Sequence, residues 1–192
     1  MSDSDSDDIQ TIDKVLKGDI DAFSRIVEKY KDRVFNYVYT QIGDFDEALD
    51  VSQEIFIMTL EALDSFRRES KFSTWLYSIM VNYCKNYRKK ISRYSLVPIN
   101  SARGEDEYEL PLPDEREDPE RDAVMNDSLR IVREEINRLP DDYREILMLR
   151  DIQGLSYNEI SEILDISLSN VKVRIHRGRE YLKNRLGARG LI

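Results

Sequence analysis

The chain has 192 residues, of which 35% are charged, and a formal net charge of -9 at pH 7; this length allows one or two small domains, and this charge argues against a protein that coats nucleic acid indiscriminately. One cysteine and one histidine provide neither an internal disulfide nor a metal cluster. No apolar run approaches the ~20 residues of a membrane-spanning helix, so we expect a cytoplasmic protein that does not insert into the membrane. We also expect it to use no metal and no cofactor.

The N-terminal part of the chain predicts three amphipathic helices. Residues 1–10 are acidic and should form a disordered tail, after which residues 11–17 form a short helix. Apolar residues at helical spacing predict a longer helix that begins at residue 21, and Gly43 is a typical C-terminal cap for it. Asp44 should cap the third helix. The polar residues on the outer side of that helix are Asp50, Gln53, Glu54 and Glu61.

A basic loop at residues 66–73, with the sequence FRRESKFS, precedes the next helix. Ser73 should cap this helix, which is expected to run through Lys89. Amides, lysines and an aromatic ring beside a basic loop suit a single-stranded nucleic acid, in which bases stack and expose their edges. Partial burial of Trp75 is the alternative, whereas Asn82 lies mid-helix, where asparagine has poor helix propensity. The residues on this stripe are Trp75, Ser78, Asn82, Lys85, Asn86 and Lys89.

The middle of the chain has no sustained period. Residues 91–121 contain four of the five prolines, and residues 105–122 carry ten acids and two arginines. Such a segment is expected to be a flexible linker. Helical spacing resumes over residues 123–140, and Asp141 should cap a short helix that ends at Gln153. No strand pattern occurs, so the expected fold is all-α.

Residues 154–183 predict two helices joined by a tight turn. Ser156 is a favourable N-cap, Glu159 completes a capping box with it, and Ser167 can cap the second helix. The missing side chain of Gly178 would let two helices approach closely. The apolar face of the second helix is expected to hold Leu168, Val171, Ile175, Gly178 and Leu182.

The outer face of this second helix is basic, since residues 167–189 carry seven Lys or Arg and one acid. In a helix-turn-helix unit, the second helix enters the major groove of DNA. A solvated helix in an ordinary bundle is the alternative. The residues that point away from the apolar face are Lys172, Val173, His176, Arg177 and Glu180, flanked by Arg174 and Arg179.

The chain also contains two longer motif blocks. The N-terminal block is DEALDVSQEIFIMTLEAL followed by FRRESKFSTWLYSIMVNYCKNYRKK, and the C-terminal block is LPDDYREILMLRDIQGLSYNEISEILDISLSNVKVRIHRGREYL. They resemble regions 2 and 4 of bacterial RNA polymerase sigma factors, specifically the small two-domain extracytoplasmic function (ECF) group. The resemblance implies two small helical domains, at residues 11–92 and 123–187, joined by an acidic flexible linker at 93–122 and followed by a tail at 188–192.

The resemblance implies a subunit for transcription initiation that is not itself an enzyme. Region 2 of such a protein binds the clamp helices of the largest subunit of core RNA polymerase and melts the −10 element of promoter DNA. Region 4 reads the −35 element as duplex DNA and contacts the flap of the second-largest subunit. An anti-sigma factor is the expected regulatory partner, in a stress or envelope response.

The resemblance also assigns residues to each contact. The core-polymerase contact corresponds to Asp50, Gln53 and Glu54. The −10 contact corresponds to Phe66, Arg67, Arg68, Lys71, Phe72, Trp75, Asn82, Lys85 and Asn86. The −35 contact corresponds to Lys172, Val173, His176 and Arg177 in the groove, to Arg150, Tyr157 and Arg174 at phosphates, and to the flanking Arg179. Leu49 and Ser78 stand where the family usually has an acid and an arginine.

Two other functions use part of the sequence. A conventional helix-turn-helix regulator would carry an N-terminal ligand or partner domain, and an unrelated helical scaffold would merely solvate its basic faces. Neither needs a polar outer helix, a basic loop and a Trp/Asn stripe in one half, so only a sigma factor uses every segment. For the acidic linker, a path inside the polymerase and a solvated spacer are the alternatives.

Overall fold

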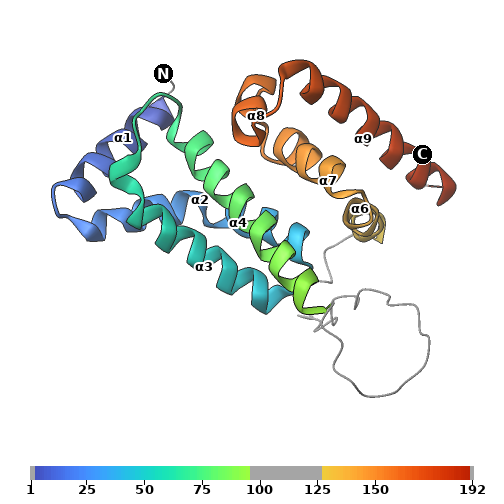
Figure 1. Ribbon diagram of the computed structural model, residues 1–192, viewed down its shortest axis with the longest axis horizontal. Helices are drawn as coiled ribbons and strands as arrows, with labels where there is room; N and C mark the ends of the chain where they lie inside the picture. The colour runs from blue at the N-terminus through green and yellow to red at the C-terminus, as the bar shows by residue number, and fades with distance from the viewer. Residues whose placement is uncertain (1–2, 96–126, 191–192) are drawn as a thin grey trace.

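The computed structural model describes residues 3–95 and 127–190, and every regular element in those residues is helical. These helices form two small domains (Figure 1), which confirms the expected all-α fold. Apart from residues 93–95, the expected linker lies outside the described residues. The N-terminal domain contains α1 (Asp3–Leu16), η1 (Ile20–Phe23), α2 (Ser24–Ile42), α3 (Phe45–Glu61), η2 (Leu63–Ser65) and α4 (Phe72–Ser95). The C-terminal domain contains α6 (Asp127–Asn137), α7 (Asp141–Leu147), the π-helical turn η3 (Met148–Ile152), α8 (Tyr157–Leu164) and α9 (Leu168–Ala188).

Local capping determines several helix ends. Gly43 ends α2 with φ of 88°, a left-handed conformation that glycine adopts without a steric penalty. Asp44 caps α3 by accepting a hydrogen bond from the backbone N–H of Glu47 at 2.8 Å. Ser156 and Glu159 form the expected capping box of α8. These ends agree with the sequence because a cap depends only on residues a few positions apart.

The start of the chain differs from the expectation. The sequence predicts a disordered tail over residues 1–10, but α1 begins at Asp3. Asp8 is only 2% exposed; it accepts a hydrogen bond from the Tyr30 hydroxyl at 2.7 Å and pairs with Lys29. Both partners belong to α2, so contacts distant in sequence stabilise a segment whose composition alone indicates disorder.

Three predicted helix starts are wrong. Ser73 does not cap α4, because this helix begins one residue earlier, at Phe72. The helix expected to begin at residue 21 begins at Ser24, after the turn η1, which Asp19 caps by accepting a hydrogen bond from the backbone N–H of Ala22 at 3.3 Å. Asp141 is the first residue of α7 and makes no cap. Its carboxylate instead accepts a hydrogen bond from Arg144 at 2.5 Å. An aspartate can cap a helix or join an ion pair, and spacing alone does not distinguish the two.

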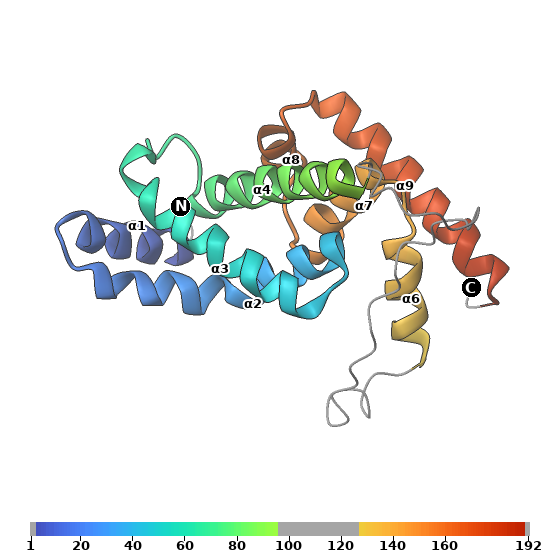
Figure 2. The same cartoon turned by 60° about the horizontal axis from the view of Figure 1, so that its bottom comes forward.

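Helix α4 connects the two domains through its side chains. It continues to Ser95, past the expected end at Lys89. It packs against α2 and α3 within its own domain and against α8 of the other domain. Figures 1 and 2 accordingly show α4 lying between α3 and α8. The buried apolar residues along α4 are Phe72, Leu76, Tyr77, Met80, Val81 and Cys84.

Helices α7 and α9 pack closely at Gly178. A Cβ atom at this position would lie 3.3 Å from side-chain atoms of Leu147 and Tyr143 on α7. The neighbouring positions Val171 and Ile175 are buried as predicted. Because Gly178 has no side chain, α9 can pack closely against α7 at this point. The opposite face of α9 remains exposed to solvent.

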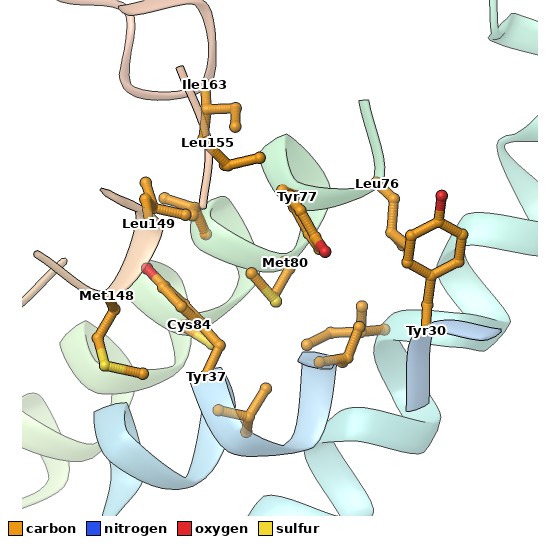
Figure 3. Close-up of a cluster of buried hydrophobic side chains, with 14 of the residues drawn as sticks. Tyr30, Tyr37, Leu76, Tyr77, Met80, Cys84, Met148, Leu149, Leu155 and Ile163 are labelled. Carbon is orange, nitrogen blue, oxygen red and sulfur yellow. The ribbon is translucent and has the colours of Figure 1, made fainter. Parts of the chain in front are cut away.

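The two domains share one apolar core cluster. Figure 3 shows side chains from both domains meeting beside α4. We call this junction the interdomain seam. Its residues are Tyr37, Tyr77, Met80 and Cys84 of the N-terminal domain and Met148, Leu149, Leu155 and Ile163 of the C-terminal domain.

Candidate functional site

The turn between α8 and α9 is defined by local contacts. Helix α8 ends at Leu164 and is capped by Asp165, which has φ of 51°. The Ser161 hydroxyl donates to the carbonyl of Ile166 at 2.6 Å. Ser167 then caps α9 by accepting from the backbone N–H of Asn170 at 3.3 Å. These contacts set the angle at which α9 leaves α8, as a helix-turn-helix requires.

The outer face of α9 is exposed and basic. Lys172 and Arg177 lie on it, and neither forms an ion pair with any residue that the structure describes. Leu168 shares the apolar face with Val171 but is 38% exposed, so that face is covered at Val171 and not at its first position. The exposed residues of this face are those expected from the spacing: Lys172, Val173, His176 and Arg177.

Arg150 and Tyr157 form one unit at the edge of this face. The Arg150 guanidinium lies 4.9 Å from the centre of the Tyr157 ring, a distance at which a cation is attracted to the face of the ring. The same side chain donates a hydrogen bond to the carbonyl of Leu155 at 2.7 Å. Both residues are half-buried, so their side chains are held in position before any ligand binds.

Arg174 and Arg179 are both paired with acids of their own domain. Arg174 lies 3.2 Å from an oxygen of Asp142, and Arg179 Nε donates to Asp151 at 3.2 Å. A phosphate approaching either arginine would have to compete with a carboxylate. The arginines that flank the outer face are therefore paired, whereas Lys172 and Arg177 on that face form no ion pair with any described residue.

Two aromatic residues of the predicted single-strand surface are buried. Phe66 is 7% exposed and Phe72 is 1% exposed, so in this conformation neither can stack on a base, contrary to the expectation. Trp75 is half-buried and packs 5.2 Å from the Phe66 ring and 5.8 Å from the Phe72 ring, measured between centroids. The packing of these apolar rings holds the loop against the core.

Some of the remaining polar residues of that surface are exposed to solvent, and others form contacts with another helix. Arg67, Asn82 and Asn86 are exposed. Arg68 has φ of 60° and pairs with Asp13 of α1. The loop is thus tied to the N-terminal helix, while the two asparagines remain open to a ligand.

Lys71 and Lys85 are paired with the other domain. Lys71 Nζ lies 2.9 Å from Glu159 on α8, and Lys85 Nζ lies 3.2 Å from Glu145 on α7. Burial raises the pKa of Glu145 despite the nearby Lys85. Burial also opposes ionisation of Glu159, but hydrogen bonds from Lys71 and Ser156 outweigh it and lower the pKa. Pairs this distant in sequence carry no signal that spacing could reveal.

The outer face of α3 combines polar and apolar residues. Asp50, Gln53 and Glu54 are exposed as predicted, and Glu54 accepts a hydrogen bond from the Tyr83 hydroxyl of α4. The apolar part of this face was not predicted from the sequence, although α3 carries more apolar residues than one buried stripe needs. These exposed apolar residues are Leu49, Ile57 and Met58.

Neither a cluster of metal-ligating side chains nor a membrane-spanning helix occurs in the described residues. Among them no group of three or more His, Cys, Asp or Glu side chains is arranged to hold a metal ion. No helix within residues 3–95 or 127–190 is both long enough and apolar enough to span a bilayer.

Family models match both domains. The model of sigma-70 region 2 matches residues 26–94, and the model of sigma-70 region 4 matches residues 129–182. The ECF RNA polymerase sigma factor SigW of Bacillus subtilis is 41% identical over 177 residues, which are 91% of this chain and 94% of that protein. The ECF RNA polymerase sigma-E factor of Escherichia coli is 37% identical over 178 residues, covering 91% and 92% of the two chains.

Solved structures share the fold at low sequence identity. CnrH in complex with the cytosolic domain of CnrY superposes with a TM-score of 0.68 at 22% identity, over 95% of this chain and 98% of that one. The sigma factor RpoE in complex with the anti-sigma factor NepR, from Bartonella quintana, gives a TM-score of 0.64 at 22% identity, over 86% and 96%. Both matches extend over the two helical domains.

Proposed function

This chain belongs to the ECF sigma factors of bacterial RNA polymerase, and from that premise we propose that it binds core polymerase, directs it to particular promoters and promotes their melting. A sigma factor is an initiation subunit and not a catalyst. The observation that carries the proposal is the exposed basic face of α9, presented by a capped helix-turn-helix. Transcription from a promoter library with purified core polymerase, with and without this chain, tests the proposal directly.

Recognition of the −35 duplex is assigned to the centre of α9. Arg177 is exposed and unpaired among the described residues, which suits a bidentate contact with guanine. Arg177→Ala should weaken duplex binding by roughly 1–3 kcal/mol and relax the preference at one base pair. Arg174→Ala is the matched control: a phosphate contact carries no sequence information, so binding should weaken equally on all sequences. A change of base preference in the Arg174 variant alone would show that the face is assigned wrongly.

Recognition of the −10 strand is assigned to α4 and the loop before it. Asn82 and Asn86 expose amides that can bond to base edges, and the exposed part of the half-buried Trp75 ring can stack on a base. Phe66 and Phe72 are left out of the contact because they anchor the loop. Asn82→Ala should reduce open-complex formation, measured with permanganate at unpaired thymines, while duplex binding at the −35 element stays unchanged. Equal loss of both activities would argue against this division.

The contact with the polymerase clamp is assigned to the outer face of α3. Its exposed apolar residues would become buried against the polymerase, and the carboxylates and the amide would form oriented polar contacts around them. Gln53→Ala together with Glu54→Ala should weaken core binding, while the fold is kept because exposed substitutions cost within about 0.5 kcal/mol. Ile57→Ala tests the apolar part separately. Undiminished core affinity in both the double variant and Ile57→Ala would rule out α3.

The acidic linker is assigned to a nucleic-acid path within the polymerase. Residues 105–122 lie outside the described part of the chain, and their ten acids would be attracted to a basic channel. Replacing those acids by Ser and Gly at constant length should alter abortive synthesis and leave promoter binding largely intact. Unchanged initiation kinetics would leave the solvated spacer as the explanation.

An anti-sigma factor is proposed as the regulatory partner. The solved RpoE structure is a complex with the anti-sigma factor NepR, and its fold extends over both domains of this chain. Affinity purification of the tagged chain from its own host should recover such a partner when transcription from its promoters is off. Recovery of core polymerase alone under that condition would contradict this part of the proposal.

A further inference from the structure

Helix α1 lies against both ends of the loop that precedes α4. It contacts η2, which ends at Ser65 just before the loop, and α4, which follows the loop. Ile12 is fully buried and Val15 is 5% exposed, so α1 is part of the core of the N-terminal domain. Figures 1 and 2 show the loop passing beside this helix. None of the proposed contacts with DNA or polymerase involves α1, which therefore has no function assigned to it so far.

Two buried rings hold the ends of the loop. Phe66 is 7% exposed and Phe72 is 1% exposed. The residues between them, 67–71, are exposed or half-buried, so burial in the core does not determine their path. A loop that is already ordered in its bound conformation binds a ligand with a smaller loss of entropy. A further contact within residues 67–71 would therefore favour binding of a strand.

Arg68 makes such a contact. Its guanidinium pairs with the carboxylate of Asp13 on α1, and its backbone has φ of 60°. This left-handed conformation is uncommon for a residue with a side chain, and it persists where the surrounding structure holds it. The ion pair with α1 connects the loop to the core at the residue whose backbone conformation is least favourable, and so it opposes relaxation of the loop.

The other end of the loop also faces α1. Asp5 and Lys71 line the same pocket, which has a volume of about 270 Å³. The pKa of Lys71 is raised, mainly by its hydrogen bond to Glu159 of α8 and to a smaller degree by the charge of Asp5. Asp5 and Asp13 lie about two turns apart on α1. Carboxylates of this helix therefore accompany the loop at Arg68 and again at Lys71.

We propose that α1 is a positioning element for recognition of the −10 strand, and that Asp13 acts through Arg68 without touching DNA. The inference rests on the proposed function of the loop. Arg68 is then a positioning residue, whereas the resemblance places it among the −10 contacts. The two roles lead to different results, because an ion pair within the protein can be reversed, whereas a cation that binds a phosphate cannot be replaced by a carboxylate.

The first experiment measures open-complex formation with core polymerase, using permanganate, on a promoter recovered from the library and on its single-base variants in the −10 element. Asp13→Arg and Arg68→Asp should each reduce discrimination between bases about two- to fivefold, the range that one exposed ion pair accounts for. The double swap should restore discrimination, since aspartate tolerates the left-handed conformation. Asp7→Arg is the matched control: it makes the same charge change at an exposed site on α1 without an ion pair to any described residue.

Substitutions of Arg68 separate the backbone from the side chain. Glycine adopts φ of 60° without a steric penalty, whereas alanine keeps the penalty and lacks the ion pair. Arg68→Ala should therefore lose more discrimination than Arg68→Gly. Equal losses in these two variants, or a double swap no better than Arg68→Asp, would show that the Arg68 side chain contacts DNA directly and would overturn the proposal. An Asp13→Arg chain that discriminates as well as the wild type would also overturn it.

The second experiment measures hydrogen exchange of the amides of residues 67–71 in the free chain, without DNA or polymerase. Exchange should be about two- to fivefold faster in Asp13→Arg than in the wild type and in Asp7→Arg, with the same circular dichroism in all three. Equal rates would overturn the proposal. Asp13→Asn, which keeps the shape of the side chain, takes the place of Asp13→Arg if that chain does not fold. If the polymerase opens no promoter of the library with this chain, the proposed function fails, and the exchange rates still decide whether α1 positions the loop.

Discussion

Glu135 should be a principal stabilising residue of the C-terminal domain. Its side chain, on α6, is 1% exposed. One carboxylate oxygen accepts from Arg185 Nε of α9, and the other lies 3.1 Å from Arg138 and 2.9 Å from Arg189. The carboxylate is thus surrounded by three guanidinium groups, of which two come from the end of the chain, and it holds α6 against α9.

The expected loss on Glu135→Gln follows from these contacts. Glutamine keeps the shape but removes the charge, and hydrogen bonds to a charged group contribute about 1.5–3 kcal/mol. The three arginines are each at least one-third exposed, so they can be hydrated after the change and no buried charge is left unpaired. We therefore expect the free energy of unfolding to fall by about 1.5–3 kcal/mol. Glu134→Gln is the matched control on the same helix, with an expected loss of at most about 1 kcal/mol.

The same carboxylate makes stability depend on pH. The hydrogen bond from Arg185 is the main reason that the pKa of Glu135 lies below its ordinary value of 4.5 in the folded chain. Between the lowered pKa and 4.5 the unfolded chain binds more protons, so stability rises with pH there. The contribution is complete above 4.5 and is lost as the pH falls through the lowered value. The difference between wild type and Glu135→Gln should shrink in that window.

Urea unfolding followed by far-UV circular dichroism measures both effects, and hydrogen exchange assigns them to α6 and α9. The two variants should be compared at neutral pH and at several values below 4.5, the ordinary pKa. A Glu135→Gln protein as stable as the Glu134→Gln control would refute the reasoning. So would a difference from wild type that stays constant down to the lowest pH.

Three further changes test packing and capping. Gly178→Ala should change stability by less than about 1 kcal/mol, since a gain of about 1 kcal/mol in helix propensity is offset by the 3.3 Å contact with Leu147. Gly178→Leu should cost about 1–3 kcal/mol by overpacking. Equal thermal midpoints of the two variants would contradict this. Asp8→Ala should cost about 1–3 kcal/mol because it leaves the Tyr30 hydroxyl without its partner, and adding Tyr30→Phe should recover part of the loss in urea unfolding. Ser156→Ala should lower stability by about 1 kcal/mol through loss of the α8 cap; unchanged exchange of the first amides of α8 would argue against it.

Helix identities and many helix ends could be read from the sequence because they depend on near neighbours. The caps at Gly43, Ser156 and Ser167 use partners no more than four positions away. The basic face of α9 follows from helical spacing in the same way. Local interactions of this kind have the same geometry in every helix, so residue type and spacing suffice to predict them.

Residue exposure was harder to predict where a helix or loop ends. Phe66 and Phe72 carry the composition of a base-stacking loop, yet they are buried, since an aromatic ring can anchor a loop as readily as it can bind a base. Leu168 fits the apolar period of α9 but is 38% exposed, whereas Val171 and Ile175 on the same face are buried. Periodicity shows which residues share a face, whereas the neighbouring elements decide how far along the helix that face is covered.

The sequence by itself determined the all-α class, the helix-turn-helix and the family. Only the tertiary structure decided that α1 is folded through Asp8 and that the two domains close on each other. The pair Lys71–Glu159 joins residues 88 positions apart, and each of the two has several oppositely charged candidates along the chain. Charge pairing over such separations is selected by the packing of whole helices, because a lysine pairs with the carboxylate that the apolar seam brings within reach.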